Sequence, residues 1–251
     1  MVLSSVTVTI LVENSSPRPD LGAEHGFSAW LDTGERRVLF DTGASGLVCA
    51  NAETLGINLA EADAIVLSHG HGDHTGGLAA AAERAEKATI YAHPAAQPSV
   101  AGRQIILSRA PEVVIPGIST TGEISRDTDF EAAAGPPVPN PDDQAIYFEV
   151  EEGLVVVVGC AHAGVVNTLR HVARRTKADK IHALLGGMHL ASVPDDRLAA
   201  TVKAFREFGI ERLGACHCTG DKAVGLFARE FPEASFRCQT GTILTFGKTD
   251  D

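Results

Sequence analysis

Three histidines and one aspartate fall within six consecutive positions of this chain, as His69, His71, Asp73 and His74. Imidazole nitrogens and carboxylate oxygens are good ligands for zinc, iron and manganese. The cluster follows the apolar segment 65–67, so it is expected on a turn after a strand. A turn can arrange such side chains around two metal positions, whereas neighbouring positions on a helix point to different faces. The pattern predicts a metal site; the alternative is a histidine-rich surface loop.

Further histidines occur in the same kind of setting later in the chain. His162, His189 and His217 each come after an apolar segment and close to glycine. Binding residues of α/β proteins gather at the carboxyl ends of strands, and glycine lets other groups approach the backbone closely. We therefore expect these three histidines to join the 69–74 cluster in one site.

The elements that must position these side chains can be predicted from hydrophobic periodicity and turn residues. Strands and helices alternate along most of the chain, which is typical of an α/β fold. The pattern weakens between residues 95 and 142, and we interpret that segment as an insertion or lid that shapes a substrate pocket. Strands are expected at 6–12, 29–31, 37–40, 64–67, 89–92, 144–149, 153–158, 180–185, 211–215 and 236–246, and helices at 45–55, 78–87, 165–176, 195–208 and from about 221 to 231.

The composition limits the classes of function. The chain has 251 residues, of which 44% are hydrophobic and 21% are charged, as in ordinary globular proteins. That length suits one large domain, which we expect to span residues 1–251. The net charge of −11 argues against a general binder of nucleic acids or anionic membranes, because phosphate contacts need clustered lysine and arginine.

Other features bear on where the protein works. The amino terminus has no basic leader followed by a small-residue cleavage site, and no apolar run approaches the roughly 20 residues of a membrane helix. Five cysteines are scattered along the chain, so a disulfide framework is not expected. The cytoplasm is the expected location and a small molecule the expected partner. The oligomeric state is open, with a homodimer as one option.

The histidine cluster resembles the signature motif of the metallo-β-lactamase superfamily. The resemblance rests on His69-Gly-His71-Gly-Asp73-His74, on the preceding Asp41-Thr42-Gly43, and on the later His162 and His217. The order of predicted elements is also similar to that superfamily over nearly the whole chain. The resemblance implies a four-layer αββα sandwich of mixed α and β class.

Four further segments resemble one branch of that superfamily, whose members are described as 7,8-dihydropterin-6-methyl-4-(β-D-ribofuranosyl)aminobenzene 5′-phosphate synthase-like. These segments are 24–28 (EHGFS), 159–167 (GCAHAGVVN), 186–190 (GGMHL) and 217–220 (HCTG). The branch resemblance implies a pterin condensation as one activity. It also implies that Glu24 and His25 are pocket residues.

The superfamily pattern implies two sets of metal ligands. The first set is His69, His71 and His162, and the second is Asp73, His74 and His217. Many members also have a bridging aspartate at the end of the strand between the last two ligand histidines, but here that strand ends in Gly186-Gly187-Met188-His189. Either His189 takes the second-metal position, or it faces the substrate and solvent alone bridges the metals.

Several other polar residues have both a functional and a structural interpretation. Asp41 is expected below the metals, where it would accept a hydrogen bond from a ligand imidazole; the alternative is a helix cap. Cys216 and Cys218 are expected to be small buried thiols that point away from His217, although thiolates also suit zinc. Structural roles are expected for His93, His171 and His182.

Metal ions held in this way activate water, so the first functional hypothesis is a dinuclear hydrolase of a small ester, phosphodiester or related anion. Asp73 would hold the second metal and accept a hydrogen bond from the water. His189 would stabilise an oxyanion or protonate the leaving group. Two divalent ions are expected, zinc first, with iron or manganese as alternatives.

Two other functions compete with this hypothesis. In the first, a transferase condenses an activated dihydropterin diphosphate with a ribofuranosylaminobenzene phosphate, and the 95–142 segment excludes water. In the second, the protein binds metal without catalysis. An oxidoreductase of the diiron-flavoprotein type is excluded because 251 residues leave no room for a flavin domain.

Overall fold

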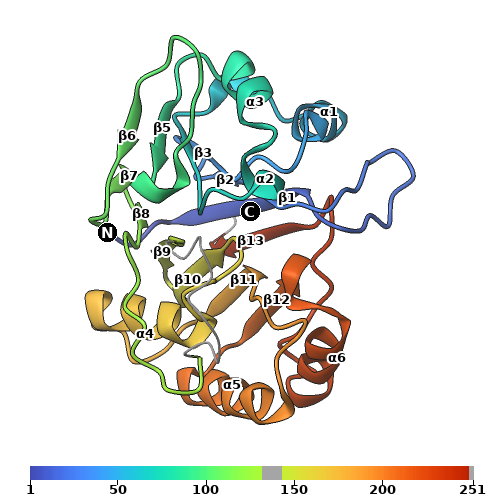
Figure 1. The fold of residues 1–251 in the computed structure, drawn as a ribbon, viewed down its shortest axis with the longest axis vertical. Coiled ribbons are helices and arrows are strands. Elements are labelled where there is room, and N and C mark those ends of the chain that lie inside the picture. Colours follow the sequence, from blue (N-terminus) through green and yellow to red (C-terminus); the bar gives the residue numbers. More distant parts are fainter. Residues whose placement is uncertain (132–142, 249–251) are drawn as a thin grey trace.

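The computed structural model describes residues 1–131 and 143–248. Two β-sheets pack face to face in the middle of the molecule, and helices cover the outer face of each sheet (Figure 1). The layers are therefore helix, sheet, sheet and helix. This arrangement confirms the predicted four-layer αββα sandwich.

The first sheet has seven strands in the order β13-β1-β2-β3-β4-β5-β6. Antiparallel pairing joins β13 to β1, β1 to β2 and β2 to β3, and parallel pairing continues from β3 to β6. The strands are β1 (Ser5–Val12), β2 (Ser28–Asp32), β3 (Arg37–Phe40), β4 (Ala64–Val66), β5 (Thr89–Ala92), β6 (Ile105–Leu107) and β13 (Ile243–Gly247).

The second sheet has six strands in the order β12-β11-β10-β9-β8-β7. The three strands β10, β11 and β12 are parallel, and the rest pair antiparallel. The run of four valines in β10 is buried on both faces, as expected for a central strand with helices on one side and a sheet on the other. The strands are β7 (Val113–Ile115), β8 (Ile118–Thr120), β9 (Ile146–Val150), β10 (Gly153–Val158), β11 (Ala183–Gly187) and β12 (Arg212–Cys216).

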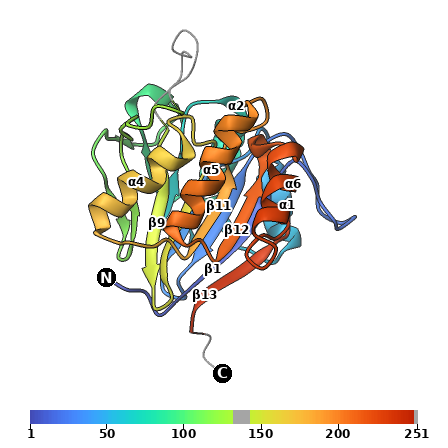
Figure 2. The same cartoon turned by 90° about the horizontal axis from the view of Figure 1, so that it is seen from below.

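The helices divide evenly between the two outer faces. Figure 2 shows α4, α5 and α6 across the second sheet, and Figure 1 places α1, α2 and α3 on the side of the first. No helix among residues 1–131 and 143–248 is long and apolar enough to cross a membrane. The helices are α1 (Leu47–Thr54), α2 (Gly72–Thr75), α3 (Leu78–Arg84), α4 (Val165–Thr176), α5 (Asp195–Phe208) and α6 (Asp221–Glu230), with single 3₁₀ turns η1 (Leu59–Glu61), η2 (Pro94–Ala96) and η3 (His217–Thr219).

Apolar side chains fill the three interfaces between the four layers. Phe40 and Phe148 lie between the sheets, Trp30 lies under α1 and α3, and Phe205 of α5 packs against Phe227 of α6. Each of these rings is at most 4% exposed. Burial of this extent is the main favourable free energy of folding, and it fixes the relative position of the strand ends.

Functional residues emerge from one edge of this sandwich because parallel strands end on the same side. β3 and β4 run parallel, as do β10, β11 and β12. The residues that follow these five strands are Asp41, the 69–74 motif, His162, His189 and His217. The fold thus delivers both halves of the predicted site from different sheets.

The segment predicted as an insertion or lid, 95–142, is partly built into the sandwich. Its described part supplies β6 at the edge of the first sheet, and β7 and β8 at the edge of the second. These short strands extend the two sheets, so residues 105–120 are part of the sandwich. Residues 132–142 lie outside the described chain, and the interpretation of 95–142 as an insertion or lid stays a prediction.

The buried carboxylate of Glu131 caps the start of α4. It accepts hydrogen bonds from the backbone N–H groups of Val166 and Asn167 at 2.9 and 2.7 Å, and from the hydroxyl of Thr128 at 3.0 Å. Replacing Glu131 by alanine is expected to lower the free energy of unfolding by about 2 kcal/mol, because buried donors lose their acceptor. Thermal unfolding of metal-free protein would measure this loss. An unchanged melting temperature would show that α4 needs no such cap.

Candidate metal centre

The structure brings the six predicted ligand side chains together at the edge where the strands end. The 69–74 stretch follows β4 and is half loop and half helix: His69 and His71 lie in the loop, and Asp73 and His74 lie in α2. This differs from the expectation of a simple turn. One turn of helix moves Asp73 and His74 away from the first two histidines, so the stretch serves two groups of side chains.

The first group consists of His69, His71 and His162. Their ring centroids lie 4.6 to 4.9 Å apart, and one nitrogen from each lies within 4.8 Å of the others. Nε2 of His69 and Nδ1 of His162 are buried and have no hydrogen-bond partner within the described chain. A buried polar atom without a partner is costly, and a bound ion is one of the few things that satisfies it. These residues therefore fit a metal ion.

The second group is centred on the carboxylate of Asp73. Its Oδ2 lies 3.3 Å from Nε2 of His217, 3.3 Å from Nε2 of His25 and 3.7 Å from Nε2 of His74. The two nitrogens of His74 and His217 are 3.1 Å apart. Ligands about 2.1 Å from a tetrahedral ion lie about 3.4 Å from one another. The spacing of these atoms matches that requirement.

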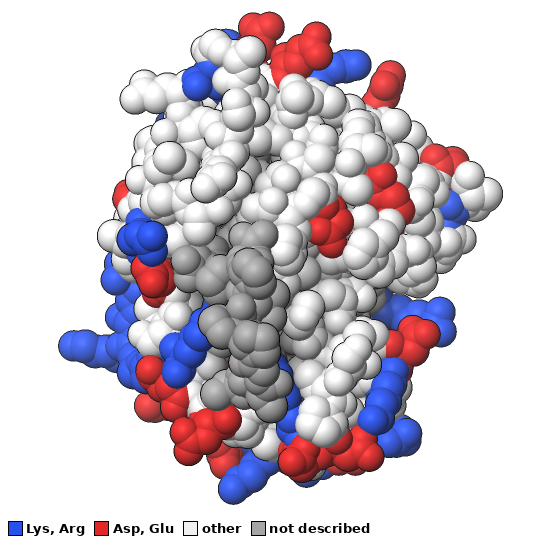
Figure 3. Space-filling view, viewed as in Figure 1, with Lys and Arg blue, Asp and Glu red and all other residues white. Residues whose placement is uncertain are grey.

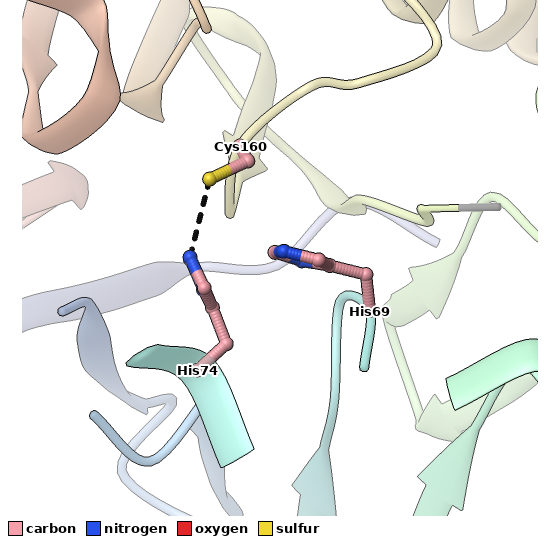
Figure 4. A group of neighbouring side chains, drawn as sticks. All are labelled: His69, His74 and Cys160. Carbon is pink, nitrogen blue, oxygen red and sulfur yellow. Dashed lines mark hydrogen bonds between the residues drawn. The ribbon is translucent and has the colours of Figure 1, made fainter. Parts of the chain in front are cut away.

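The two groups are adjacent, and a cysteine lies where they meet. The rings of His69 and His74 are 4.2 Å apart. Figure 4 shows the thiol of Cys160 pointing towards His74, with Sγ 3.2 Å from Nε2. Cys160 is 3% exposed and lies two residues before His162.

The family model of the metallo-β-lactamase superfamily matches residues 21–206, which is most of the chain. The chain belongs to the metallo-β-lactamase superfamily. A search of curated proteins finds two relatives from Methanocaldococcus jannaschii. One, a 7,8-dihydropterin-6-methyl-4-(β-D-ribofuranosyl)-aminobenzene-5′-phosphate synthase, is 30% identical, with 89% of this chain and 90% of the relative covered. The other is uncharacterized and is 28% identical, covering 86% of this chain and 92% of the relative.

Two solved structures share the fold of this chain. Tm1679, described as a metal-dependent hydrolase of the β-lactamase superfamily, has a TM-score of 0.80 and 28% identity, with 97% of this chain and 100% of that one covered. Zn²⁺-bound PqqB from Methylobacterium extorquens is 16% identical with a TM-score of 0.59, covering 95% and 99% of the two chains, and shares the fold.

Asp41 lies beneath the site and connects its two groups of histidines through hydrogen bonds. Its buried carboxylate accepts a hydrogen bond from Nδ1 of His74 at 2.7 Å, and it accepts two more from the backbone N–H and hydroxyl of Ser68 at 2.7 Å. The Ser68 oxygen in turn lies 2.8 Å from Nδ1 of His69. One carboxylate therefore orients one histidine of each group, in agreement with the position predicted for Asp41.

Two residues after β1 support His217, and sequence reasoning missed both. Glu13 accepts the backbone N–H of His217 at 2.9 Å, and Oδ1 of Asn14 lies 2.9 Å from its Nδ1. On the other side of the centre, Asp143 accepts the backbone N–H groups of His162 and Ala163. These contacts join residues far apart in the chain, so no local signal in the sequence could have indicated them.

The protonation states suit metal binding. Burial and the neighbouring imidazoles lower the pKa of His69, and burial together with His189 lowers the pKa of His162 to about 3. Burial acts to raise the pKa of Asp73. The hydrogen bond with His217 and the nearby imidazoles have the larger combined effect, so the pKa of Asp73 lies below its usual value. Near neutral pH the two histidines are thus neutral and the aspartate is charged, which is the state that a cation needs.

Backbone strain concentrates at the site. Six residues other than glycine have a positive φ among those described, and four of them follow the site strands: Asp41, Ala161, His189 and His217, with φ of 49 to 56°. Residues other than glycine adopt a positive φ at a cost of about 1–3 kcal/mol each. Such a cost persists only where the surrounding structure imposes it.

Glu24 and His25, which the branch resemblance implies as pocket residues, have different neighbours. The carboxylate of Glu24 accepts hydrogen bonds from the backbone N–H groups of Ala44 and Ser45 and from the Ser45 hydroxyl. It therefore holds the loop after Asp41, and a contact with the substrate stays a prediction. His25, by contrast, reaches Asp73 as described above.

The position of His189 bears on the two alternatives left open by the sequence. Its ring lies edge-on against His162 with 4.6 Å between the ring centroids, beside the first group and not the second, which favours the alternative in which it faces the substrate. Cys218 does not point away from the site, because η3 turns the chain after β12 and His217 has a φ of 52°. Cys216 is a buried core thiol, as predicted.

Position 159 requires glycine because the chain directly after β10 lies close to the side chains of Ser68 and Asp41. A Cβ at this position would lie 2.2 Å from Oγ of Ser68 and 2.7 Å from Oδ2 of Asp41. Replacement by alanine is expected to cost about 2 kcal/mol in unfolding free energy and to weaken metal binding about tenfold. Denaturant unfolding and metal titration would measure both effects. The control is Gly225→Ala in α6, where the new methyl meets open space; equal losses in both variants would contradict the account.

Proposed function

We propose that the protein is a metal-dependent hydrolase that uses two adjacent divalent ions to cleave a small ester, phosphodiester or related anion. The observation that carries the proposal is the pair of neighbouring ligand groups. One contains two buried nitrogens that have no hydrogen-bond partner among residues 1–131 and 143–248, and the other contains ligand atoms at the spacing of a tetrahedral site. Tm1679 is described as a metal-dependent hydrolase, and this chain matches it over its whole length at 28% identity. That description supports the same reaction class.

The distances within the two groups support one ligand assignment. His69, His71 and His162 would hold the first ion. Asp73, His74 and His217 would hold the second, with His25 as a further donor. Nitrogen and carboxylate donors suit zinc first, with iron or manganese as alternatives. Bound at these positions, two such ions would activate water and polarise the bond that is cleaved.

The chain's own residues would orient the reaction. Asp41 and Ser68 fix the ring orientation of His69 and His74, so little reorganisation is needed when an ion binds. Asp73 is the carboxylate that could accept a hydrogen bond from the attacking water. His189 is exposed and next to His162, which suits contact with the leaving group of a substrate.

A charged substrate does not need a charged protein surface. The chain carries a net charge of −11, and on the face shown in Figure 3 acidic and basic side chains are interspersed around the rim. Attraction of an anion is therefore expected to come from the bound ions themselves.

The second candidate is the transferase predicted from the branch resemblance. The observation that favours it is the 30% identity with the Methanocaldococcus synthase over about nine tenths of both chains. In this reaction the same ions would bind the diphosphate of the activated dihydropterin, and the ribofuranosylaminobenzene phosphate would take the place of water.

One comparison of products separates the two reactions. Metal-loaded protein is incubated in ¹⁸O-water with a bis-aryl phosphodiester, a thioester and a lactone, and separately with the dihydropterin diphosphate, with and without the aromatic amine. Hydrolysis predicts ¹⁸O in the product and turnover without the amine. Diphosphate release that depends on the amine would favour the transferase. No turnover of any substrate by protein with two ions bound would overturn the hydrolase.

A further inference from the structure

Three donor side chains outside the two proposed metal groups meet at the same edge of the sandwich. Cys160 follows β10, His189 follows β11 and Cys218 follows β12. A sulfur or nitrogen atom from each lies within 4.8 Å of the others. None of the three belongs to the ligand sets proposed above. They form what we call the thiol group.

The thiol group is unlike the other close pair of cysteines in the chain. Cys216 and Cys238 are both buried in the apolar cluster between the sheets, surrounded by valine, isoleucine and phenylalanine. Cys160 and Cys218 instead face histidines and backbone polar groups. Thiols that only fill space are usually found in apolar surroundings, so the polar setting points to a ligand.

One backbone hydrogen bond already prepares Cys218 to act as an acceptor, because the N–H of His189 donates to its Sγ at 3.2 Å. Backbone N–H bonds to sulfur are a common means of stabilising metal-bound thiolates. The Cys218 thiol itself donates a hydrogen bond to the carbonyl oxygen of Cys160 at 3.7 Å, which holds the two cysteine segments close together.

The backbone is strained at one donor position and directly beside the other two. Ala161 follows Cys160, His217 precedes Cys218, and His189 is itself a donor; their φ angles are 52, 52 and 49°. Gly187 is also needed, because a Cβ there would lie 2.8 Å from Sγ of Cys218. Without these features the two sulfurs and the imidazole would not converge. Strain at three neighbouring strand ends is expected where function requires the arrangement.

We propose that Cys160, Cys218 and His189 form a third metal site, selective for a thiophilic divalent ion of the zinc and cadmium class. Two sulfurs and one imidazole are a common donor set for zinc, with the fourth position left open to solvent or substrate. Each thiol that binds the ion releases one proton to solvent, so occupancy falls as the pH decreases.

This site goes beyond the proposed function but is linked to it through two residues. Cys160 lies 3.2 Å from Nε2 of His74, so an ion on the thiol group lies next to the second histidine group. An ion there also engages His189, which is then not free to meet the leaving group. Thiophilic metal at this site is therefore expected to slow the reaction proposed above.

Cobalt(II) titration of metal-free protein tests the site without any need for activity. Cobalt bound to thiolate absorbs in the near ultraviolet, whereas cobalt bound only to nitrogen and oxygen shows weaker visible bands. The native protein is expected to show the thiolate absorption. Cys160→Ser and Cys218→Ser should each lower it by about half, because each removes one of two sulfur ligands. Cys49→Ser, at a partly buried thiol in α1, is the matched control and should leave it unchanged.

The outcomes separate this inference from the proposed function. Visible bands without thiolate absorption would overturn the thiol site and leave the histidine groups intact. Thiolate absorption with no binding to the histidine groups would overturn the hydrolase and support the thiol site. Should the serine variants fail to fold, ¹¹³Cd NMR of the native protein decides, because sulfur ligands shift the cadmium resonance far from its nitrogen and oxygen range. A spectrum without a sulfur-bound resonance would refute the site.

Discussion

Replacing His71 by alanine is expected to remove the ion of the first group and to lower turnover about a thousandfold. If that ion contributes about 4 kcal/mol to the transition state, its loss corresponds to a factor of about 10³ in rate. His71 is a suitable position because it is partly exposed at the start of α2, so its removal leaves the core unchanged. Metal content per chain and the initial rate of hydrolysis, measured on the same preparation, give the result.

The matched control for this prediction is His182→Ala. His182 pairs with Glu211 at 3.0 Å, away from the site strand ends, and is also partly exposed. This variant should keep its full metal content and rate. Loss of activity in both variants, or full metal content in His71→Ala, would show that the first group is not the metal site we propose.

Replacing Asp41 by asparagine is expected to have the largest effect on stability. The fully buried carboxylate accepts three hydrogen bonds from Ser68 and His74. In asparagine an NH₂ group replaces one of the two acceptor oxygens, so that a donor would face another donor. Bonds to a buried charged group contribute about 1.5–3 kcal/mol each, so a loss of about 4 kcal/mol in unfolding free energy is expected. Asparagine tolerates the positive φ of 56° at this position, so the backbone itself is not the cause.

Metal affinity should fall together with stability in the Asp41 variant. The rings of His69 and His74 lose their orientation, and such supporting contacts typically account for a 10- to 100-fold change in affinity, or about 1–3 kcal/mol. Denaturant unfolding of metal-free protein and a competitive zinc titration would measure the two effects. Asp20→Asn, in an exposed ion pair with Arg18, should change neither. Native-like affinity in Asp41→Asn would refute the orienting role.

Local signals in the sequence predicted individual strands and the 69–74 motif, whereas the sandwich was implied by the superfamily resemblance. The motif lies within six positions, and strands such as β3, β5 and β10 match their predicted bounds since apolar runs and turn residues mark them. The short strands β6, β7 and β8 were missed. Each has three residues, which is too few to show a clear periodicity, and several side chains of β6 and β7 are exposed.

The site residues that the sequence missed depend on chain geometry that local patterns do not encode. Cys218 was not assigned to the site because the alternation of an extended strand places neighbouring side chains on opposite faces. The left-handed conformation of His217 breaks that alternation. Cys160 carried no signal of its own apart from its place in the 159–167 segment. Glu13 and Asn14 reach His217 only because β1 ends at the same edge as β12, a contact between residues about 200 positions apart.

Two adjacent ions are expected to occupy this edge of the sandwich when the protein is loaded with metal. Anomalous diffraction at the metal absorption edge, from crystals of the loaded protein, would locate them. We expect one peak among His69, His71 and His162, and a second among Asp73, His74 and His217. A fully loaded protein with no peak in either group would refute the dinuclear site.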